Sequence, residues 1–287
     1  MVNPRIQRLP TITGTTINSR QSEPEKDLSG AGRSSIRQTR QAPTGRQPRE
    51  DIHGQFADMT TNLPKDSRLP TQEFLLDTGA GGLSATLNYA KAASHALLLA
   101  HGAGADHQHT HMSSLADAFE TQGFTTLRFN FPFKQQGRNR VDSKALSIDC
   151  IIEAATWLQN NHSLPLLVGG HSYGGRMATH AVVEQNLDCD ALVLCSFPLH
   201  PAGKPSTERS IHLKDITQPM IFLSGTRDAL AEQNLLTEVA NTLNPKSRLH
   251  WLETGDHSFK VLKRTRTNPI NIYEEAATAT REFIDAL

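Results

Sequence analysis

The sequence predicts an α/β fold in which a mostly parallel β-sheet is covered by helices on both faces. From residue 72 onward, short and continuously apolar runs alternate with segments of helical periodicity. Continuously apolar runs are typical of parallel strands that are buried on both faces. In addition, a serine flanked by glycines follows one such run, in "LLVGGHSYGG" at 166–175, where a strand would turn into a helix.

The expected elements follow one another along the chain. We interpret "TQEFLLDT" and "LSATLNYA" as an antiparallel hairpin at the sheet edge. Six apolar runs then predict strands, at 95–102, 124–131, 165–172, 189–197, 218–225 and 247–253. Apolar residues at helical spacing predict helices around 112–119, 148–155 and 273–284.

Residues 1–68 differ in composition from the rest of the chain. They contain one aromatic residue, Phe56, and are rich in Arg, Gln, Ser, Thr and Pro. Such a segment buries too little apolar surface to offset the entropy of ordering, so we expect a disordered polar arm. Residues 69–287 are then sufficient for one well-cored α/β domain. The arm carries 11 Lys and Arg against 7 Asp and Glu, interspersed rather than grouped, which favours a solvated tail over a nucleic-acid-binding segment.

Charge, hydropathy and cysteine usage exclude several classes of protein. The formal net charge is zero, and no segment resembles a membrane span or a secretory leader. Cys150, Cys189 and Cys195 form neither a disulfide framework nor a metal-binding spacing. We therefore expect a cytoplasmic protein with reduced thiols, no membrane contact and no nucleic-acid partner. The oligomeric state stays open.

The segment Gly170-His171-Ser172-Tyr173-Gly174 matches the G-x-S-x-G pattern of a nucleophile elbow. Because the pattern arises by chance about one time in ten in a chain of this length, its context matters. In an elbow the serine takes an unfavourable backbone conformation, and the glycines let strand and helix close without collision of side chains. The alternative interpretation is an ordinary turn between a strand and a helix.

A serine hydroxyl becomes a nucleophile only when a base removes its proton, and suitable residues follow two later strands. Asp228 and His257 each come directly after a predicted strand. His257 would accept the Ser172 proton, and Asp228 would orient the imidazole. Taken singly, Asp228 could instead cap the next helix and His257 could be a surface loop residue. Asp256 is the alternative acid, but adjacency to His257 directs its side chain elsewhere.

The segment "AHGAGA" at 100–105 supplies a candidate oxyanion hole. It follows an apolar run, and its small residues expose backbone N–H groups near the elbow. We expect the N–H groups of Ala103 and Tyr173 to be the two donors. His101 is interpreted as a residue that shapes this loop.

Together, Ser172, Asp228, His257 and "HGAGA" resemble the α/β-hydrolase superfamily over residues 72–287, with the three residues in its chain order. The segments "HGAGAD", "LRFNFPFKQQGR", "GGHSYGGRMA", "FPLHPAGKP" and "LSGTRDAL" are similar to the small, nearly lidless dienelactone-hydrolase-like group. That group includes bacterial predicted hydrolases, a testis-expressed animal protein and a subunit of a histone-acetyltransferase complex. The resemblance implies an α/β-hydrolase fold with a minimal lid. True dienelactone hydrolases use cysteine as nucleophile, so their substrate is not carried over to Ser172.

Two further segments could shape the substrate site. The segment "FNFPFKQQGRNR" offers pocket-lining rings and carboxylate-binding charges, namely Phe131, Phe133, Lys134, Arg138 and Arg140. The loop 196–217 is the only one able to cover the site, and it is too short for a lid domain, so we expect an open pocket. Arg176, on the helix after the elbow, is expected to pack or pair structurally.

The alternating histidines His107, His109 and His111 could bind zinc from an extended loop. No cysteine or second ligand pair lies at a familiar spacing, which favours a polar loop at the rim of the site. We therefore expect no metal.

These residues predict a serine hydrolase that cleaves an acyl bond in a small molecule through an acyl-enzyme intermediate, without a cofactor. A small carboxylic ester is the favoured substrate, and thioester, lactone and peptide stay open. The alternative is a non-catalytic protein-interaction scaffold on a hydrolase fold, as the chromatin-complex relative suggests. The presence of all three residues, Ser172, Asp228 and His257, argues against a scaffold, which needs none of them.

Overall fold

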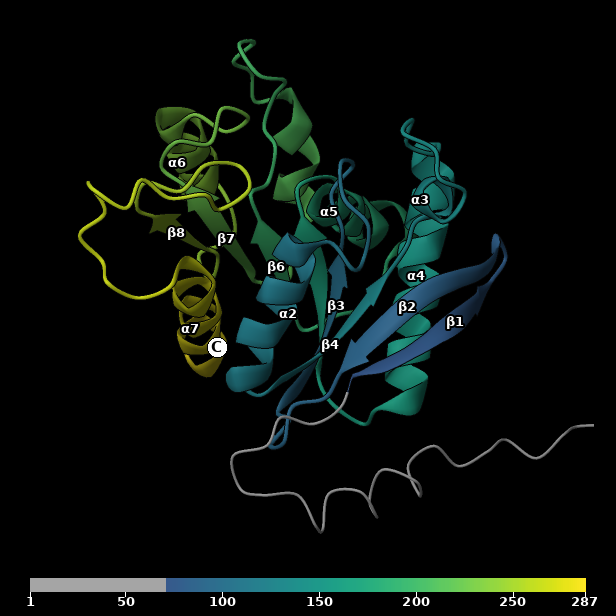
Figure 1. Ribbon diagram of the computed structural model, residues 1–287. Coiled ribbons are helices and arrows are strands. Elements are labelled where there is room, and N and C mark those ends of the chain that lie inside the picture. The colour runs from purple at the N-terminus through teal and green to yellow at the C-terminus, as the bar shows by residue number, and fades with distance from the viewer. Residues whose placement is uncertain (1–70) are drawn as a thin grey trace, which may run out of the picture. The chain divides into compact units, whose positions relative to one another are not determined.

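The computed structural model describes residues 71–287, which form one eight-stranded sheet with helices on both faces (Figure 1). The predicted arm at 1–68 lies outside the described residues. The strand order is β1-β2-β4-β3-β5-β6-β7-β8. Strand β2 (Gly81–Asn88) is antiparallel to both β1 (Gln72–Thr78) and β4 (Phe124–Phe129), and every other neighbouring pair is parallel.

The other five strands lie inside the segments that the apolar runs predict. They are β3 (His95–Ala100), β5 (Leu166–His171), β6 (Ala191–Cys195), β7 (Met220–Gly225) and β8 (Arg248–Leu252). Every residue of β4, β5, β6 and β7 is buried. The prediction of a mostly parallel sheet with an antiparallel hairpin at one edge is therefore confirmed.

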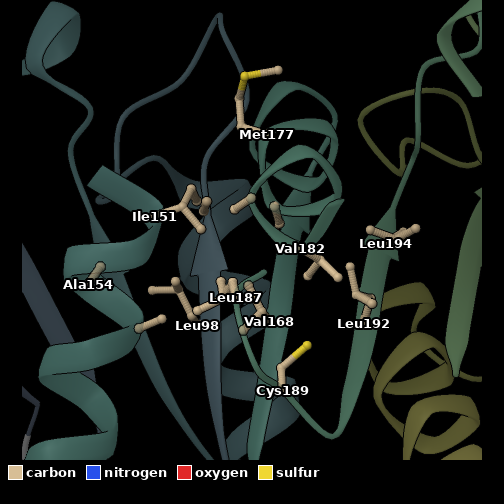
Figure 2. Packing of buried hydrophobic residues seen from close by; sticks show 14 of the residues in the cluster. Leu98, Ile151, Ala154, Val168, Met177, Val182, Leu187, Cys189, Leu192 and Leu194 are labelled. Carbon is tan, nitrogen blue, oxygen red and sulfur yellow. The ribbon is translucent and has the colours of Figure 1, made fainter. Parts of the chain in front are cut away.

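Two helical layers cover the sheet. Helices α2 (Thr110–Thr121) and α7 (Ile272–Asp285) pack on one face, and α4 (Lys144–Asn161) and α5 (Tyr173–Gln185) pack on the other (Figure 1). Successive side chains of a strand point to opposite faces, so Leu97 of β3 joins the first layer and Leu98 joins the second. Figure 2 shows the second layer, where Leu98 and neighbouring strand residues lie against α4 and α5.

Three shorter helices occupy connections between these elements. They are α3 (Pro132–Gln135), α6 (Gln233–Asn241) and the 3₁₀ helix η2 (Glu208–Asp215). Helix η2 lies in the loop 196–217, so this loop contains a single short helix and no lid domain. Helix α6 begins after Glu232, which is its N-cap. Asp228 therefore does not cap it.

Burial accounts for the state of the three cysteines. Cys150, Cys189 and Cys195 are free and buried, and burial raises the pKa of each thiol to about 12. They are therefore uncharged core residues. Within residues 71–287, no helix combines the length and the apolar character needed to cross a membrane.

Candidate active site

Ser172 occupies the sharp turn between β5 and α5. Its backbone has φ 51° and ψ −111°, a left-handed conformation that strains any residue other than glycine. The turn is held on both sides, because the Ser172 N–H donates to the Cys195 carbonyl (2.8 Å) and the Ser172 carbonyl accepts from the Arg176 N–H (3.0 Å). The surrounding structure thus holds the Ser172 backbone in a conformation that is intrinsically unfavourable for serine.

The two glycines of the motif are required by strand β3. A Cβ atom added to Gly170 would lie 2.2 Å from the Ala100 carbonyl oxygen, and one added to Gly174 would lie 2.3 Å from the same atom. Gly170 also has φ 150°. The end of β3 therefore passes directly beside both sides of the elbow, and only glycine fits there.

Ser172, His257 and Asp228 form a continuous hydrogen-bonded chain. His257 Nε2 lies 2.8 Å from Ser172 Oγ. His257 Nδ1 lies 2.8 Å from Asp228 Oδ2 and 2.9 Å from its Oδ1. Since Asp228 accepts at Nδ1–H, the free lone pair of Nε2 faces the Ser172 hydroxyl. The Asp228 side chain is 0% exposed, and that of His257 is 24% exposed, so the imidazole borders solvent while the acid does not.

The loop after β7 positions the acid. Asp228 Oδ1 also accepts from the Leu230 N–H (2.8 Å), which fixes the carboxylate beside its own turn. The alternative acid, Asp256, accepts instead from the N–H groups of Ser258 (2.8 Å) and Lys260 (3.0 Å). Asp256 therefore shapes the loop that carries His257, and Asp228 is the acid in contact with the imidazole.

Two backbone N–H groups near the elbow have no acceptor among the described residues. Tyr173 is the first residue of α5, where N–H groups lack intrahelical partners. Ala103 is exposed in the loop after β3. In the part of the chain that the structure describes, neither N–H donates to the protein. Both predicted donors are therefore free to bind a ligand oxygen.

His101 shapes the loop that carries Ala103. Its Nδ1 donates to the Gly102 carbonyl (2.8 Å), and its Nε2 accepts from the Phe131 N–H (3.1 Å). These two contacts require the neutral ring, and burial lowers the pKa of His101 to about 4. His101 thereby ties this loop to the end of β4.

No sequence pattern indicates that His171 joins the loops of the site. Its Nε2–H donates to the His257 carbonyl (2.8 Å), and a Cβ atom on Gly102 would lie 2.8 Å from its Nδ1. The His111 ring packs against it at 4.4 Å and 69°. Burial, followed by the charge of His257, lowers the pKa of His171 to about 4. A neutral His171 therefore connects the loop of the candidate base with the loop of Ala103.

The predicted pocket residues are placed differently from the expectation. Phe131 and Phe133 are 0% exposed and pack against the Tyr173 ring at 5.5 and 6.1 Å, so they support Tyr173 and present no surface to a substrate. Arg138 pairs with Asp142 at 2.5 Å, which compensates its charge. Arg140 is exposed on the same connection.

The three alternating histidines have three different environments. His107 Nδ1 lies 3.0 Å from Asn130 Oδ1. His109 caps α2 by accepting from the His111 N–H (3.2 Å). The His111 ring points the other way, with Nδ1 3.0 Å from the Tyr273 hydroxyl. Among residues 71–287, no three His, Cys, Asp or Glu side chains are arranged to hold a metal ion.

Several solved protein structures are similar to this one over most of the described chain. XC6422 from Xanthomonas campestris, an α/β serine hydrolase without a lid, has a TM-score of 0.59 at 17% identity, covering 77% of this chain and 97% of its own. Dienelactone hydrolase from Anabaena variabilis has a TM-score of 0.60 at 19% identity, covering 75% and 98%. Est1E from Butyrivibrio proteoclasticus, solved with ferulic acid, has a TM-score of 0.59 at 15% identity, covering 74% and 98%.

These structural likenesses show the fold, and a family model matches the sequence itself. The model describes an alpha/beta hydrolase domain and matches residues 93–285. The matched range includes β3 to β8 and the three residues Ser172, Asp228 and His257. The chain belongs to the alpha/beta hydrolase domain family.

Proposed function

We propose that this protein is a serine hydrolase that cleaves an acyl bond, with a small carboxylic ester as the favoured substrate. The observation that carries the proposal is the 2.8 Å contact between Ser172 Oγ and His257 Nε2, with Asp228 at 2.8 Å on the other ring nitrogen. An ordinary turn serine has no base within reach of its hydroxyl. The proposal assigns the role of base to His257 and that of orienting acid to Asp228, both within hydrogen-bond distance of their partners.

The proposed first half-reaction acylates Ser172. As Ser172 Oγ attacks the carbonyl carbon, His257 Nε2 takes the hydroxyl proton, and the Asp228 carboxylate stabilises the imidazolium. The carbonyl oxygen becomes an oxyanion that accepts from the N–H groups of Ala103 and Tyr173. When the tetrahedral intermediate collapses, the C–O bond to the alcohol breaks and His257 returns the proton to the leaving oxygen.

The second half-reaction releases the acid. His257 removes a proton from water, whose oxygen attacks the acyl carbon, and the bond to Ser172 Oγ breaks. His257 then returns its proton to Ser172. The absence of a lid domain over the described residues leaves room for water and for small substrates. Among the similar structures, one is a dienelactone hydrolase and another was solved with ferulic acid, which supports a small ester.

A fluorophosphonate probe tests the proposal directly, because labelling requires an activated serine and a stabilised oxyanion. We expect the protein to be labelled at Ser172 and to hydrolyse short p-nitrophenyl esters. In Ser172→Ala and His257→Ala, labelling should be lost and turnover should fall by about a millionfold.

Ser196 provides the matched control. It also follows a strand with φ 51°, but it is completely buried and its Oγ has no hydrogen-bond partner among residues 71–287. Ser196→Ala should therefore still be labelled. A folded protein that neither reacts with the probe nor hydrolyses the esters would contradict the proposal and favour the scaffold alternative.

A further inference from the structure

Helix η2 packs on α5, the helix that begins at the elbow. His212 Nε2 of η2 is 2.8 Å from Thr179 Oγ1 of α5. The His212 ring also stacks on the His180 ring, with centroids 3.9 Å apart and planes 13° apart. These contacts fix the register of the two helices.

The same register places one arginine of each helix on the side that faces the other helix. Arg209 precedes His212 by three residues, which is one turn of a 3₁₀ helix, so the two side chains share a face. Arg176 precedes His180 by one turn of α5 and shares its face in the same way. Burial, followed by the charge of Arg209, lowers the pKa of Arg176, which agrees with this juxtaposition. The arginine pair therefore lies on the Ser172 side of the histidine pair.

Neither arginine has a partner of opposite charge in the part of the chain that the structure describes. Within residues 71–287, no ion pair or hydrogen bond is made by the guanidinium of Arg176 or of Arg209, and the Nε of Arg176 is buried without an acceptor. Of the two expectations for Arg176, packing or pairing, pairing is therefore not met among these residues, whereas its Nε is indeed buried. By contrast, Arg138 pairs with Asp142, and Arg281 pairs with Asp285.

The nearest carboxylate on this face of α5 is already engaged. Glu184 Oε1 lies 2.7 Å from Lys144 Nζ and 2.8 Å from His180 Nδ1, one further turn away from Ser172. Both arginines are partly buried, and like charges held near each other at such positions are less favourable than charges paired with an anion. Two guanidiniums are also well suited to a planar oxyanion, which each can bind through two N–H groups.

We propose that Arg176 and Arg209 bind an oxyanion, a carboxylate or a phosphate, that is part of the substrate cleaved at Ser172. Arg176 lies four residues beyond Ser172 along α5, a rise of about 6 Å. The substrate is then an ester with an anionic group a few bonds from the carbonyl that reacts. This inference rests on the proposed function, because it assigns the substrate class of the same site.

A pair of esters of equal length tests the substrate class. p-Nitrophenyl hemisuccinate carries a terminal carboxylate, and p-nitrophenyl valerate carries a methyl group instead. We expect the intact protein to have the higher kcat/KM for the hemisuccinate. Arg176→Met and Arg209→Met should each lower the ratio of the two kcat/KM values by about tenfold or more, as the loss of a charged hydrogen bond predicts. Lys214→Met removes an exposed cation from the same helix and should leave the ratio unchanged.

A binding measurement separates this inference from the proposed function. In the Ser172→Ala protein, calorimetry should show that monomethyl succinate or methyl phosphate binds at least about tenfold more tightly than methyl butyrate, with the preference lost on adding Arg209→Met. Preference for the succinate identifies a carboxylate, and preference for the phosphate ester identifies a phosphate.

Binding of neither anion, or a kinetic ratio unchanged in both arginine variants, overturns the subsite. Ester hydrolysis and probe labelling at Ser172 would then still support the function. Conversely, the protein could bind the anion through Arg209 and yet not react with the fluorophosphonate probe. That result would support the anion subsite and contradict the proposed hydrolase function.

Discussion

Replacing Ser172 by glycine and by alanine separates the strain in its backbone from the role of its hydroxyl. Both variants lose the hydrogen bond to His257, so they differ only in the Cβ atom. At φ 51° and ψ −111°, a Cβ atom costs about 1–3 kcal/mol, whereas glycine is free to adopt this conformation. Glycine loses about 0.5–1 kcal/mol more conformational entropy on folding. We therefore expect Ser172→Gly to be more stable than Ser172→Ala by about 0.5–2 kcal/mol.

Equilibrium unfolding in urea, followed by far-UV circular dichroism, measures this difference. In thermal unfolding, each kcal/mol corresponds to a Tm difference of about 2–4 °C for a domain of this size. Glu238, exposed in α6, is the control, because at an ordinary helical position Glu238→Gly should be less stable than Glu238→Ala by about 1 kcal/mol. The sign of the glycine effect should thus reverse between the two sites. Equal stability of the two Ser172 variants, or greater stability of Ser172→Ala, would refute the argument that the elbow stores strain.

Four further outcomes follow from the site and its surroundings. Asp228→Asn should lower ester turnover by about four orders of magnitude, whereas Asp256→Asn should leave it within a few fold; the reverse result would make Asp256 the acid. His171→Phe should lower kcat more than it changes KM, and His171→Gln, which keeps an N–H donor, should recover part of the lost kcat. An equal loss of kcat in both variants would contradict the role of His171 in positioning the His257 loop. Because burial lowers the pKa of His101 to about 4, below its ordinary 6.5, the unfolded chain takes up a proton first as the pH falls. The free energy of unfolding should therefore decrease from pH 6.5 to 4, and urea midpoints at each pH will measure this decrease. The decrease should be smaller in His101→Gln; an equal decrease in that variant would show that His101 does not cause the pH dependence. Deleting residues 1–68 should leave Tm and turnover nearly unchanged, and a loss of either would move the proposed domain boundary.

Much of the fold could be predicted from the sequence because its main signals are local. A parallel strand buried on both faces needs an unbroken apolar run, and every residue of the strands β4, β5, β6 and β7 is indeed buried. The elbow was also visible, since a strained turn beside a close strand requires Gly170 and Gly174. Even the edge hairpin was correctly placed, at β1 and β2.

The remaining features depend on segments that are distant in the sequence. Helix η2 has no strong apolar pattern, and it forms where the loop 196–217 packs on α5. The predicted pocket lining by Phe131 and Phe133 was wrong because their burial is decided by Tyr173 and His101, which come from other elements. Apolar character alone does not distinguish a ring that lines a pocket from one that supports its wall.

The sequence by itself determined the fold class, the elbow and the chain order of Ser172, Asp228 and His257, because each follows from a pattern of neighbouring residues. Tertiary structure alone decided that Asp228 contacts an imidazole 29 residues away, which in turn meets a hydroxyl 85 residues away. It also decided that Arg176 of α5 lies within electrostatic reach of Arg209 of η2, with neither guanidinium paired to an acid among residues 71–287. The distances between these side chains are set when the sheet aligns the carboxyl ends of its parallel strands and when η2 packs on α5. No local pattern encodes that alignment, since it comes from the burial of the two helical layers as a whole.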